Sequence, residues 1–175
     1  MLSRLVSTST ARRLTTQTLG GRPGAWFSTG PRALEGIKPI YTADVSAIGA
    51  RNGRIESSDG ILKHDLSLPK ALGGPGGAKT NPEQLFAAGY AACFGSAMNA
   101  VAGKQKVQLS EDTKVQAQVS IGKDGEGNLG LGVHLTISSP GVDKATLDKV
   151  VQDAHIMCPY SRATRNNVQV QLSVE

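Results

Sequence analysis

The first part of the chain shows the alternation of apolar and polar positions that is typical of strands. Residues 41–48 and 61–68 are rich in β-forming side chains and alternate loosely, which predicts a strand in each. Residues 54–57 predict a return strand between them. The dipeptide Asn52-Gly53 predicts a two-residue hairpin turn, because both residue types tolerate a positive φ. The pattern therefore predicts three consecutive short strands.

A long apolar segment follows, and it is preceded by the start signals of a helix. Asn81 suits the N-cap and Pro82 the first helical position, while Thr80 and Glu83 have the spacing of a capping box. The helix is expected to end at Gly103. After Glu83 it is almost uncharged and rich in small side chains. This predicts a central helix that is buried on all sides.

The last part of the chain alternates between strand and helix patterns. Residues 113–121 and 129–138 predict two strands, residues 143–157 carry the apolar face of a helix, and residues 168–174 predict a closing strand. This order of elements predicts an α+β domain of two layers.

Residues 1–34 differ in composition from the rest of the chain. They contain five arginines, many hydroxyl side chains and no acidic residue, which predicts a mitochondrial transit peptide, followed by one domain over residues 35–175. A disordered basic tail is the alternative. Residues 35–175 hold 14 basic and 14 acidic side chains, so the net charge of +5 belongs to residues 1–34. A nucleic-acid-binding domain would carry its own basic excess, which this domain lacks.

No membrane-spanning helix is expected. A span needs about 20 consecutive apolar residues. The longest apolar region, residues 85–102, is interrupted by glycine, serine and asparagine.

Two cysteines, Cys93 and Cys158, are the candidate reactive groups. Cys93 lies in the middle of the apolar helix, where burial raises the pKa of a thiol and leaves it inert unless a cation is near. The candidate cations are Arg51, Arg162 and Arg165. Cys158 precedes Pro159, which predicts a turn at the end of a helix that is exposed or able to move. Composition alone leaves both open as packed core thiols.

Glu83 is a candidate partner for one of these arginines, because a carboxylate holds a guanidinium by a bidentate ion pair. The spacing limits this arrangement. Glu83 and Cys93 are ten residues apart, which is about 15 Å along an ideal helix.

Other chemistries are open from the residues alone. His155 and Cys158 are one helical turn apart and could share a metal ion, with further ligands drawn from Cys93, His64 or His134. His155 with Asp153 could instead serve a cysteine hydrolase, or its charge could suit the C-terminal end of the helix. The glycine-rich residues 73–77 lack the endings of phosphate-binding motifs and predict a flexible loop.

Two motifs resemble those of the organic hydroperoxide resistance (Ohr) proteins of the Ohr/OsmC superfamily. The segment Asn81-Pro-Glu-Gln-Leu-Phe-Ala-Ala-Gly-Tyr-Ala-Ala-Cys93 resembles the first cysteine motif of that family, and Cys158-Pro-Tyr-Ser-Arg resembles the second. The likeness extends over about residues 38–175. The sequence departs from the family pattern at Ala50 and Asn52, which flank Arg51, and at Arg162, and each departure leaves the reactive groups in place.

The resemblance implies a peroxidase that needs no metal, haem or other cofactor. Cys93 would be the thiolate that attacks an organic hydroperoxide, and Cys158 would resolve the resulting sulfenic acid into a disulfide. Arg51 and Glu83 fall where the family keeps a catalytic arginine and its carboxylate. The apolar wall of the helix would bind fatty or alkyl hydroperoxides, with three aromatic residues as candidates: Phe86, Tyr90 and Phe94.

The resemblance also implies a fold and partners. The fold would have an antiparallel sheet, a long central helix and a second helix, in an intertwined homodimer with active sites at the subunit interface. The reductant would be a lipoylated protein or dihydrolipoamide, which agrees with a location in the mitochondrial matrix. The alternatives are a redox sensor or lipid-binding protein that is not an enzyme, and a cysteine-dependent hydrolase.

Overall fold

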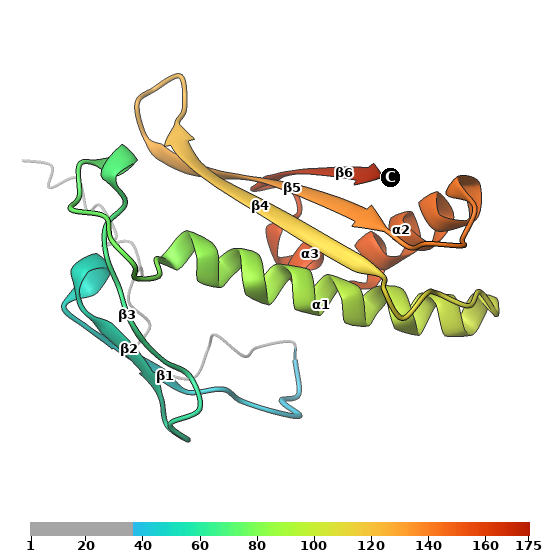
Figure 1. Cartoon of the computed structure of the whole chain (residues 1–175), viewed down its shortest axis with the longest axis horizontal. Coiled ribbons are helices and arrows are strands. Elements are labelled where there is room, and N and C mark those ends of the chain that lie inside the picture. Colours follow the sequence, from blue (N-terminus) through green and yellow to red (C-terminus); the bar gives the residue numbers. More distant parts are fainter. Residues whose placement is uncertain (1–36) are drawn as a thin grey trace, which may run out of the picture. The chain divides into compact units, whose positions relative to one another are not determined.

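The computed structural model describes residues 37–175, and the predicted transit peptide at residues 1–34 lies outside the described residues. The chain divides into two units. Residues 37–42, the described part of the first unit, contain no helix or strand. The second unit, Ala43–Glu175, holds all described elements in the order β1–β2–β3–α1–β4–β5–α2–α3–β6 (Figure 1). This is the predicted α+β class.

Two three-stranded sheets replace the single antiparallel sheet that was expected. The first has the order β1 (Val45–Ile48), β2 (Arg54–Ser57) and β3 (Lys63–Asp65), and both of its pairings are antiparallel. The second has the order β4 (Lys114–Lys123), β5 (Leu129–Ser138) and β6 (Gln169–Val174). Here β4 and β5 are antiparallel, whereas β6 runs parallel to β5. The parallel pairing is possible because two helices, α2 (Lys144–Met157) and α3 (Pro159–Thr164), carry the chain back across the sheet.

The loop between β1 and β2 differs from the predicted two-residue turn. Ile48 pairs with Arg54, so five residues connect the strands, and positive φ values occur at Gly49 and Ala50. Gly53 has a negative φ, but a Cβ there would lie 1.7 Å from the carbonyl oxygen of Ile48, so glycine is needed for space. The loop folds as a short 3₁₀ turn, Ala50–Asn52, which presents Arg51.

The helix α1 (Pro82–Gln105) begins as predicted and ends two residues later than predicted. The Asn81 side chain accepts a hydrogen bond from the backbone amide of Gln84, and Pro82 occupies the first turn. Because Asn81 is the N-cap, Thr80 and Glu83 do not form a capping box, and Glu83 bonds Arg51 instead. The helix ends at Lys106, which adopts a left-handed conformation.

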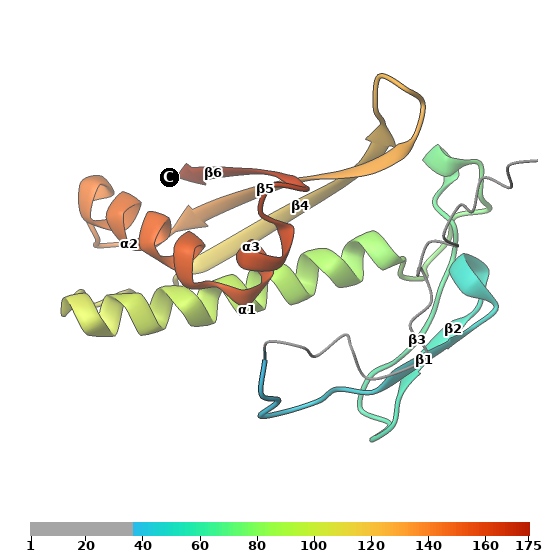
Figure 2. The same cartoon turned by 180° about the vertical axis from the view of Figure 1, so that it is seen from behind.

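The core lies between the second sheet and the helices on one of its faces (Figure 2). Alternate residues of β5 (Val133, Leu135 and Ile137) face this core, as predicted. Helix α2 (Lys144–Met157), capped by Asp143, contributes its apolar side, and α1 contributes one face. The buried α1 residues are Tyr90, Phe94, Ala97, Met98, Val101 and Ala102.

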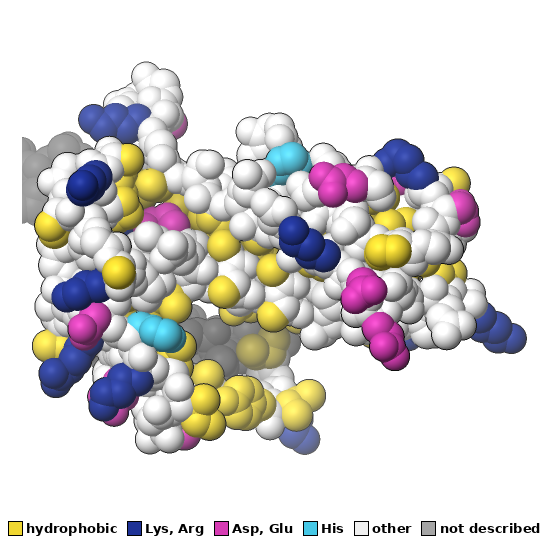
Figure 3. Space-filling view, viewed as in Figure 1, with side chains coloured by type: hydrophobic (Ala, Val, Ile, Leu, Met, Phe, Trp, Pro, Cys, Tyr) yellow, Lys and Arg dark blue, Asp and Glu magenta, His cyan; other side chains and the backbone are white. Residues whose placement is uncertain are grey.

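The expectation that α1 is buried on all sides is wrong for the single chain. Its other face carries a row of exposed small residues at four-residue spacing: Ala88, Ala92, Ser96 and Ala100. Apolar side chains are visible along this helix at the surface (Figure 3). By length and composition α1 also meets the criterion for a membrane span. Its buried face packs in the core of the domain, and a helix that forms part of a protein core can meet the same criterion.

Replacing Leu147 by alanine tests this core. Leu147 of α2 is 1% exposed, so Leu147→Ala should lower the free energy of unfolding by about 2–5 kcal/mol through lost packing and an internal cavity. Lys149 lies on the exposed side of the same helix, and Lys149→Ala should change it by about 0–1 kcal/mol. Urea unfolding measures both values, and an equal loss in the two variants would contradict this packing.

Candidate functional site

The two cysteine side chains face each other across a helix contact. Cys93 lies in the middle of α1, and Cys158 lies between α2 and the short helix α3 (Pro159–Thr164). The thiol of Cys158 points at the Sγ atom of Cys93, with 3.6 Å between the two sulfur atoms. A disulfide bond of roughly 2.05 Å would need an approach of only about 1.5 Å. The structure thus brings together two residues that are 65 positions apart in the sequence.

Cys158 occupies the joint between two helices. Its φ and ψ of −58° and 126° lie outside the helical region, as expected for a residue before proline. Its backbone amide bonds Ala154 in α2, and its carbonyl oxygen accepts from the amide of Arg162 in α3. The predicted exposure of this turn is therefore wrong, because the Cys158 side chain is fully buried, while its ability to move stays a prediction. Pro159 starts α3, which the sequence analysis did not predict.

The environment of Cys93 disfavours its thiolate within one chain. Burial raises the pKa of the Cys93 thiol, and the adjacent Cys158 thiol raises it further, while the backbone amide of Tyr160 acts in the lowering direction. Within residues 37–175 no cation contributes to this pKa. Arg162 is exposed, and Arg165 donates to the carbonyl oxygen of His155. Within residues 37–175, the thiol pair therefore has no adjacent cation that would favour the thiolate.

The predicted cation and carboxylate form a pair of their own. The two terminal nitrogens of Arg51 donate to the two carboxylate oxygens of Glu83, at 2.8 and 2.7 Å. This bidentate bond lowers the pKa of Glu83, so the carboxylate is ionised at neutral pH. Glu83 lies in the first turn of α1, ten residues before Cys93. The Arg51–Glu83 ion pair and the two thiols are thus at separate places within one chain.

An apolar pocket of about 350 Å³ lies beside the ion pair. Arg51 and Glu83 supply its polar wall, and its other lining residues are Pro82, Phe86, Ile121, Leu129, Gly130 and Leu131. The last four come from the ends of β4 and β5, and the sequence analysis missed them. Leu129 and Leu131 are large apolar residues beside the polar turn at 124–128, and both are exposed. Their position next to that turn was the sequence signal that could have identified the pocket.

Of the three aromatic residues expected to bind substrate, only Phe86 lines this pocket. Tyr90 and Phe94 are fully buried in the core, so their expected place in a substrate pocket is corrected for the single chain. They lie one helical turn apart on the face of α1 that packs against α2 and α3. Phe86 still touches this cluster, with its ring edge-on to Tyr90 at 5.9 Å.

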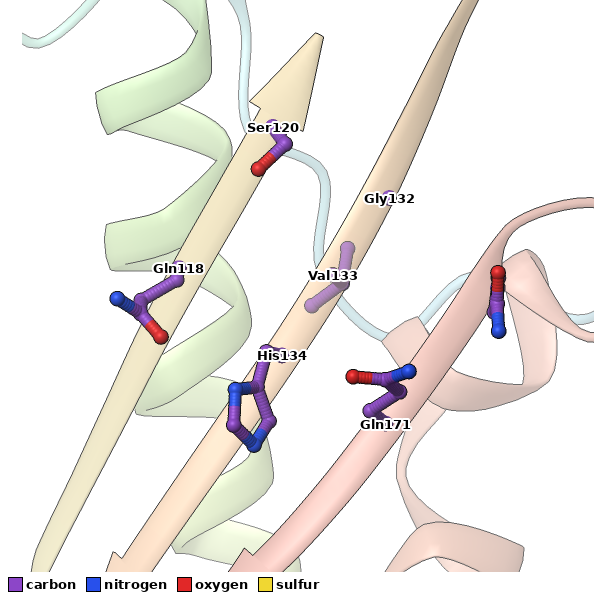
Figure 4. Close-up of a pocket in the computed structure, with 7 residues that line it drawn as sticks. Gln118, Ser120, Gly132, Val133, His134 and Gln171 are labelled. Atoms are coloured by element: carbon purple, nitrogen blue, oxygen red, sulfur yellow. The ribbon is translucent and has the colours of Figure 1, made fainter. Parts of the chain in front are cut away.

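A second pocket lies on the opposite face of the β4–β5–β6 sheet and has a different character. It has a volume of about 340 Å³ and is lined mostly by polar side chains, among them Gln118, His134 and Gln171 (Figure 4). His134 also hydrogen-bonds the hydroxyl of Ser173. Neither cysteine lines this pocket, so it is separate from the thiol pair.

The other candidate chemistries find less support in the geometry. Within the described part of the chain, no three His, Cys, Asp or Glu side chains are grouped so as to hold a metal ion. His155 bonds the hydroxyl of Ser161, and its pKa is lowered by burial and by Arg165, so it is not the charged helix terminus that was expected. The amides of Gly74 and Gly76 bond carbonyl oxygens of the same loop, which leaves them no free role in binding phosphate.

The burial of the two thiols predicts the order in which they react. In the reduced native protein, iodoacetamide should modify Cys93 first. Cys158 should react at least about tenfold more slowly, because its thiol must wait for local opening. Peptide mapping over time measures both rates, and the urea-unfolded chain is the control in which the rates converge. Equal rates in the native protein would contradict the buried position of Cys158.

Comparisons with known proteins show the family to which the chain belongs. Residues 74–173 match the family model of the OsmC-like proteins. The chain is 51% identical over 137 residues to the organic hydroperoxide resistance protein of Xanthomonas axonopodis pv. citri (strain 306), covering 78% of this chain and 96% of that protein. It is 44% identical to organic hydroperoxide resistance protein OhrB of Bacillus subtilis (strain 168), covering 78% and 98%.

A solved structure shows the same fold. The crystal structure of an organic hydroperoxide resistance protein from Legionella pneumophila matches with a TM-score of 0.74 and 48% identity. The match covers 79% of this chain and 99% of that one. The chain therefore belongs to the Ohr/OsmC superfamily.

Proposed function

We propose that this protein is a thiol peroxidase that reduces organic hydroperoxides to alcohols. The observation that carries the proposal is the 3.6 Å separation of Cys93 and Cys158 in a chain whose relatives are named for organic hydroperoxide resistance. Two free thiols at this distance can be oxidised to a disulfide with little movement of the helices. A hydrolase would need only one of them.

The proposed reaction has three steps. The Cys93 thiolate attacks the peroxide oxygen, the O–O bond breaks, and the alcohol leaves after taking up a proton, so that Cys93 becomes a sulfenic acid. The Cys158 sulfur attacks the sulfenic sulfur, which forms the disulfide and releases water. An external dithiol then reduces the disulfide by exchange, becomes oxidised itself and restores both thiols.

Arg51 is proposed to act on Cys93 of a second copy of the chain. Ten residues of α1 separate Glu83 of the ion pair from the thiol within one chain, and burial raises the pKa of Cys93. An antiparallel arrangement of two α1 helices would bring the N-terminal end of one helix toward the middle of the other. The guanidinium, fixed by Glu83, would then lower the pKa of the thiol.

The surface of the single chain supports such a dimer. The β1–β3 sheet leaves most of its residues exposed, including Val45 and Ile48. The row of small side chains on α1 allows another helix to approach closely, because no long side chain intervenes. A second copy is the simplest cover for both surfaces, and an intertwined homodimer is the proposed assembly.

The apolar pocket supports an organic substrate. Phe86, Leu129 and Leu131 would contact the alkyl or acyl group, while Arg51 would face the peroxide end. Burial of an alkyl chain contributes roughly 0.8 kcal/mol per methylene, a contribution that hydrogen peroxide lacks. Fatty-acid or alkyl hydroperoxides are therefore the proposed substrates.

The proposed reductant is a lipoylated protein or free dihydrolipoamide, and the proposed location is the mitochondrial matrix. The support is the family resemblance for the reductant and the composition of residues 1–34 for the location. The two proposals agree, because the lipoylated 2-oxoacid dehydrogenases are mitochondrial.

Treatment of the reduced protein with one equivalent of an alkyl hydroperoxide tests the two-cysteine reaction. The expected product has lost two hydrogen atoms and contains a Cys93–Cys158 linked peptide, as measured by intact mass and peptide mapping. Cys158→Ser should consume one equivalent of peroxide, stop as a sulfenic acid and lose turnover with dihydrolipoamide. The matched control is Ser96→Ala, an exposed serine of α1, which should keep the linkage.

Different results would support different functions. A disulfide that forms without turnover would favour a redox sensor. Full cycling by Cys158→Ser would contradict the two-cysteine mechanism, and an equal rate with hydrogen peroxide would contradict a selective apolar pocket.

Mixing two inactive variants tests whether Arg51 acts across the dimer. Arg51→Ala and Cys93→Ser should each be inactive alone. After joint unfolding and refolding, the mixture should recover about a quarter of wild-type activity, because half of the dimers are mixed and each contains one complete site. In the Arg51→Ala protein, alkylation of Cys93 should have its pH midpoint above the ordinary thiol value of about 8.5, because burial and the Cys158 thiol both raise the pKa of Cys93 and no guanidinium opposes them.

The control mixture is Cys93→Ser with Cys158→Ser. Both cysteines come from the same chain in the structure, so this mixture should stay inactive. No recovery in the first mixture would mean that Arg51 serves its own chain or has no role in activation.

A further inference from the structure

A buried network of polar side chains lies in the helix contact beside Cys158 and has no role in the reaction steps proposed above. At its centre is the hydroxyl of Ser161, which is fully buried three residues after Cys158. The Tyr90 hydroxyl donates to it at 3.0 Å, and Nδ1 of His155 lies 3.0 Å away on another side. One hydroxyl thus ties α3, the helix after Cys158, to both α1 and α2.

The network also reaches the backbone that faces Cys93. The Tyr90 hydroxyl lies 3.2 Å from Oγ1 of Thr164, and that hydroxyl donates to the carbonyl oxygen of Tyr160 at 2.9 Å. Tyr160 is also the residue whose amide is directed at the Cys93 thiol. The side chain of Tyr90 therefore bonds the segment that carries the Cys158 thiol and the Tyr160 amide, the two groups next to Cys93.

Gly89, the residue before Tyr90, allows a close contact with Tyr160 because it has no side chain. A Cβ at Gly89 would lie 3.1 Å from the hydroxyl oxygen of Tyr160 and 3.3 Å from its ring, which is closer than ordinary packing. The missing side chain therefore leaves room for the Tyr160 ring against α1. The ring centroid of Tyr160 lies 5.7 Å from that of Tyr90.

We propose that Tyr90 and Ser161 are positioning residues for the resolving cysteine, holding Cys158 within reach of Cys93 so that disulfide formation outpaces a second oxidation. Neither residue lines the apolar pocket proposed for the substrate. Their bonds join α1 to α3 beside Cys158, so they hold the 3.6 Å separation of the sulfur atoms on which disulfide formation depends. This inference deepens the proposed function and rests on it.

The proposal concerns a branch point in the chemistry. The sulfenic acid of Cys93 can react with the Cys158 thiol to give the disulfide and water. It can instead react with a second hydroperoxide, which oxidises it to a sulfinic acid and is itself reduced to an alcohol. A displaced Cys158 slows the first branch and leaves the second unchanged, so the share of sulfinic product reports the position of Cys158.

Tyr90→Phe tests the proposal because it removes one hydroxyl and keeps the ring. In rapid-mixing experiments the first step, one sulfenic acid per hydroperoxide, should keep its wild-type rate. Disulfide formation should become roughly tenfold slower, the size of effect expected when a reacting group is misplaced by a fraction of an ångström to an ångström. Mass spectrometry at excess hydroperoxide should show a matching rise in sulfinic acid at Cys93. Ser161→Ala should shift the same ratio in the same direction.

The control is Ile137→Val, which removes one methylene from the core strand β5, away from α3. It should lower the unfolding midpoint and leave the ratio of disulfide to sulfinic acid unchanged. Wild-type partitioning in both Tyr90→Phe and Ser161→Ala would overturn the positioning role, as would an equal slowing of both steps. Wild-type protein that forms no disulfide with hydroperoxide would refute the proposed function itself, so the two failures are distinguishable.

Discussion

The contact of α1 with α2 and α3 is the interaction on which the rest of the structure depends. Tyr90, Phe94 and Met98 bury one face of α1 against these helices and the second sheet. The same contact places a sulfur atom from the middle of α1 against a sulfur atom at the joint of α2 and α3. Core packing and thiol geometry are therefore set together, and a change in one changes the other.

The second constraint is that one chain does not combine charge and thiol. Arg51 and Glu83 neutralise each other at the start of α1, and the pocket beside them is lined by the far ends of β4 and β5. Cys93 lies further along the helix, where burial raises its pKa. In the proposed dimer, this half-buried thiol would become reactive only on assembly, which would protect the unassembled chain from oxidation. The exposed small-residue face of α1 is the proposed surface of that assembly.

The polar network around Ser161 shows how hydrogen bonds can fix the position of a fully buried thiol. Apolar packing alone tolerates small shifts, because dispersion contacts have little directional preference. Hydrogen bonds do have a directional preference, and the network joins three helices through the single hydroxyl of Ser161. None of the described buried side-chain polar atoms lacks a partner, so the polar groups in this core cost little to bury.

Much of the fold was predictable from local patterns. The strands at 54–57 and 129–138 and the start of α1 at Asn81-Pro82 were correct, because alternation and capping act over a few residues. Both cysteines and the Arg51–Glu83 pair were also identified, through residue chemistry and family motifs. The β1–β2 turn was mispredicted because the space at Gly53 depends on the carbonyl oxygen of Ile48, a contact that no dipeptide preference reports.

The sequence by itself determined most of the elements, the candidate reactive residues and the family, since these depend on side-chain chemistry and short-range order. Only the tertiary structure decided that Cys158 is buried, that β6 is parallel to β5, and that Tyr90 and Phe94 belong to the core. It also showed that, among the described residues, Arg51 pairs with Glu83 and no cation acts on Cys93. These outcomes depend on which distant segments pack together, and a helical period specifies which residues share a face without specifying the partner of that face.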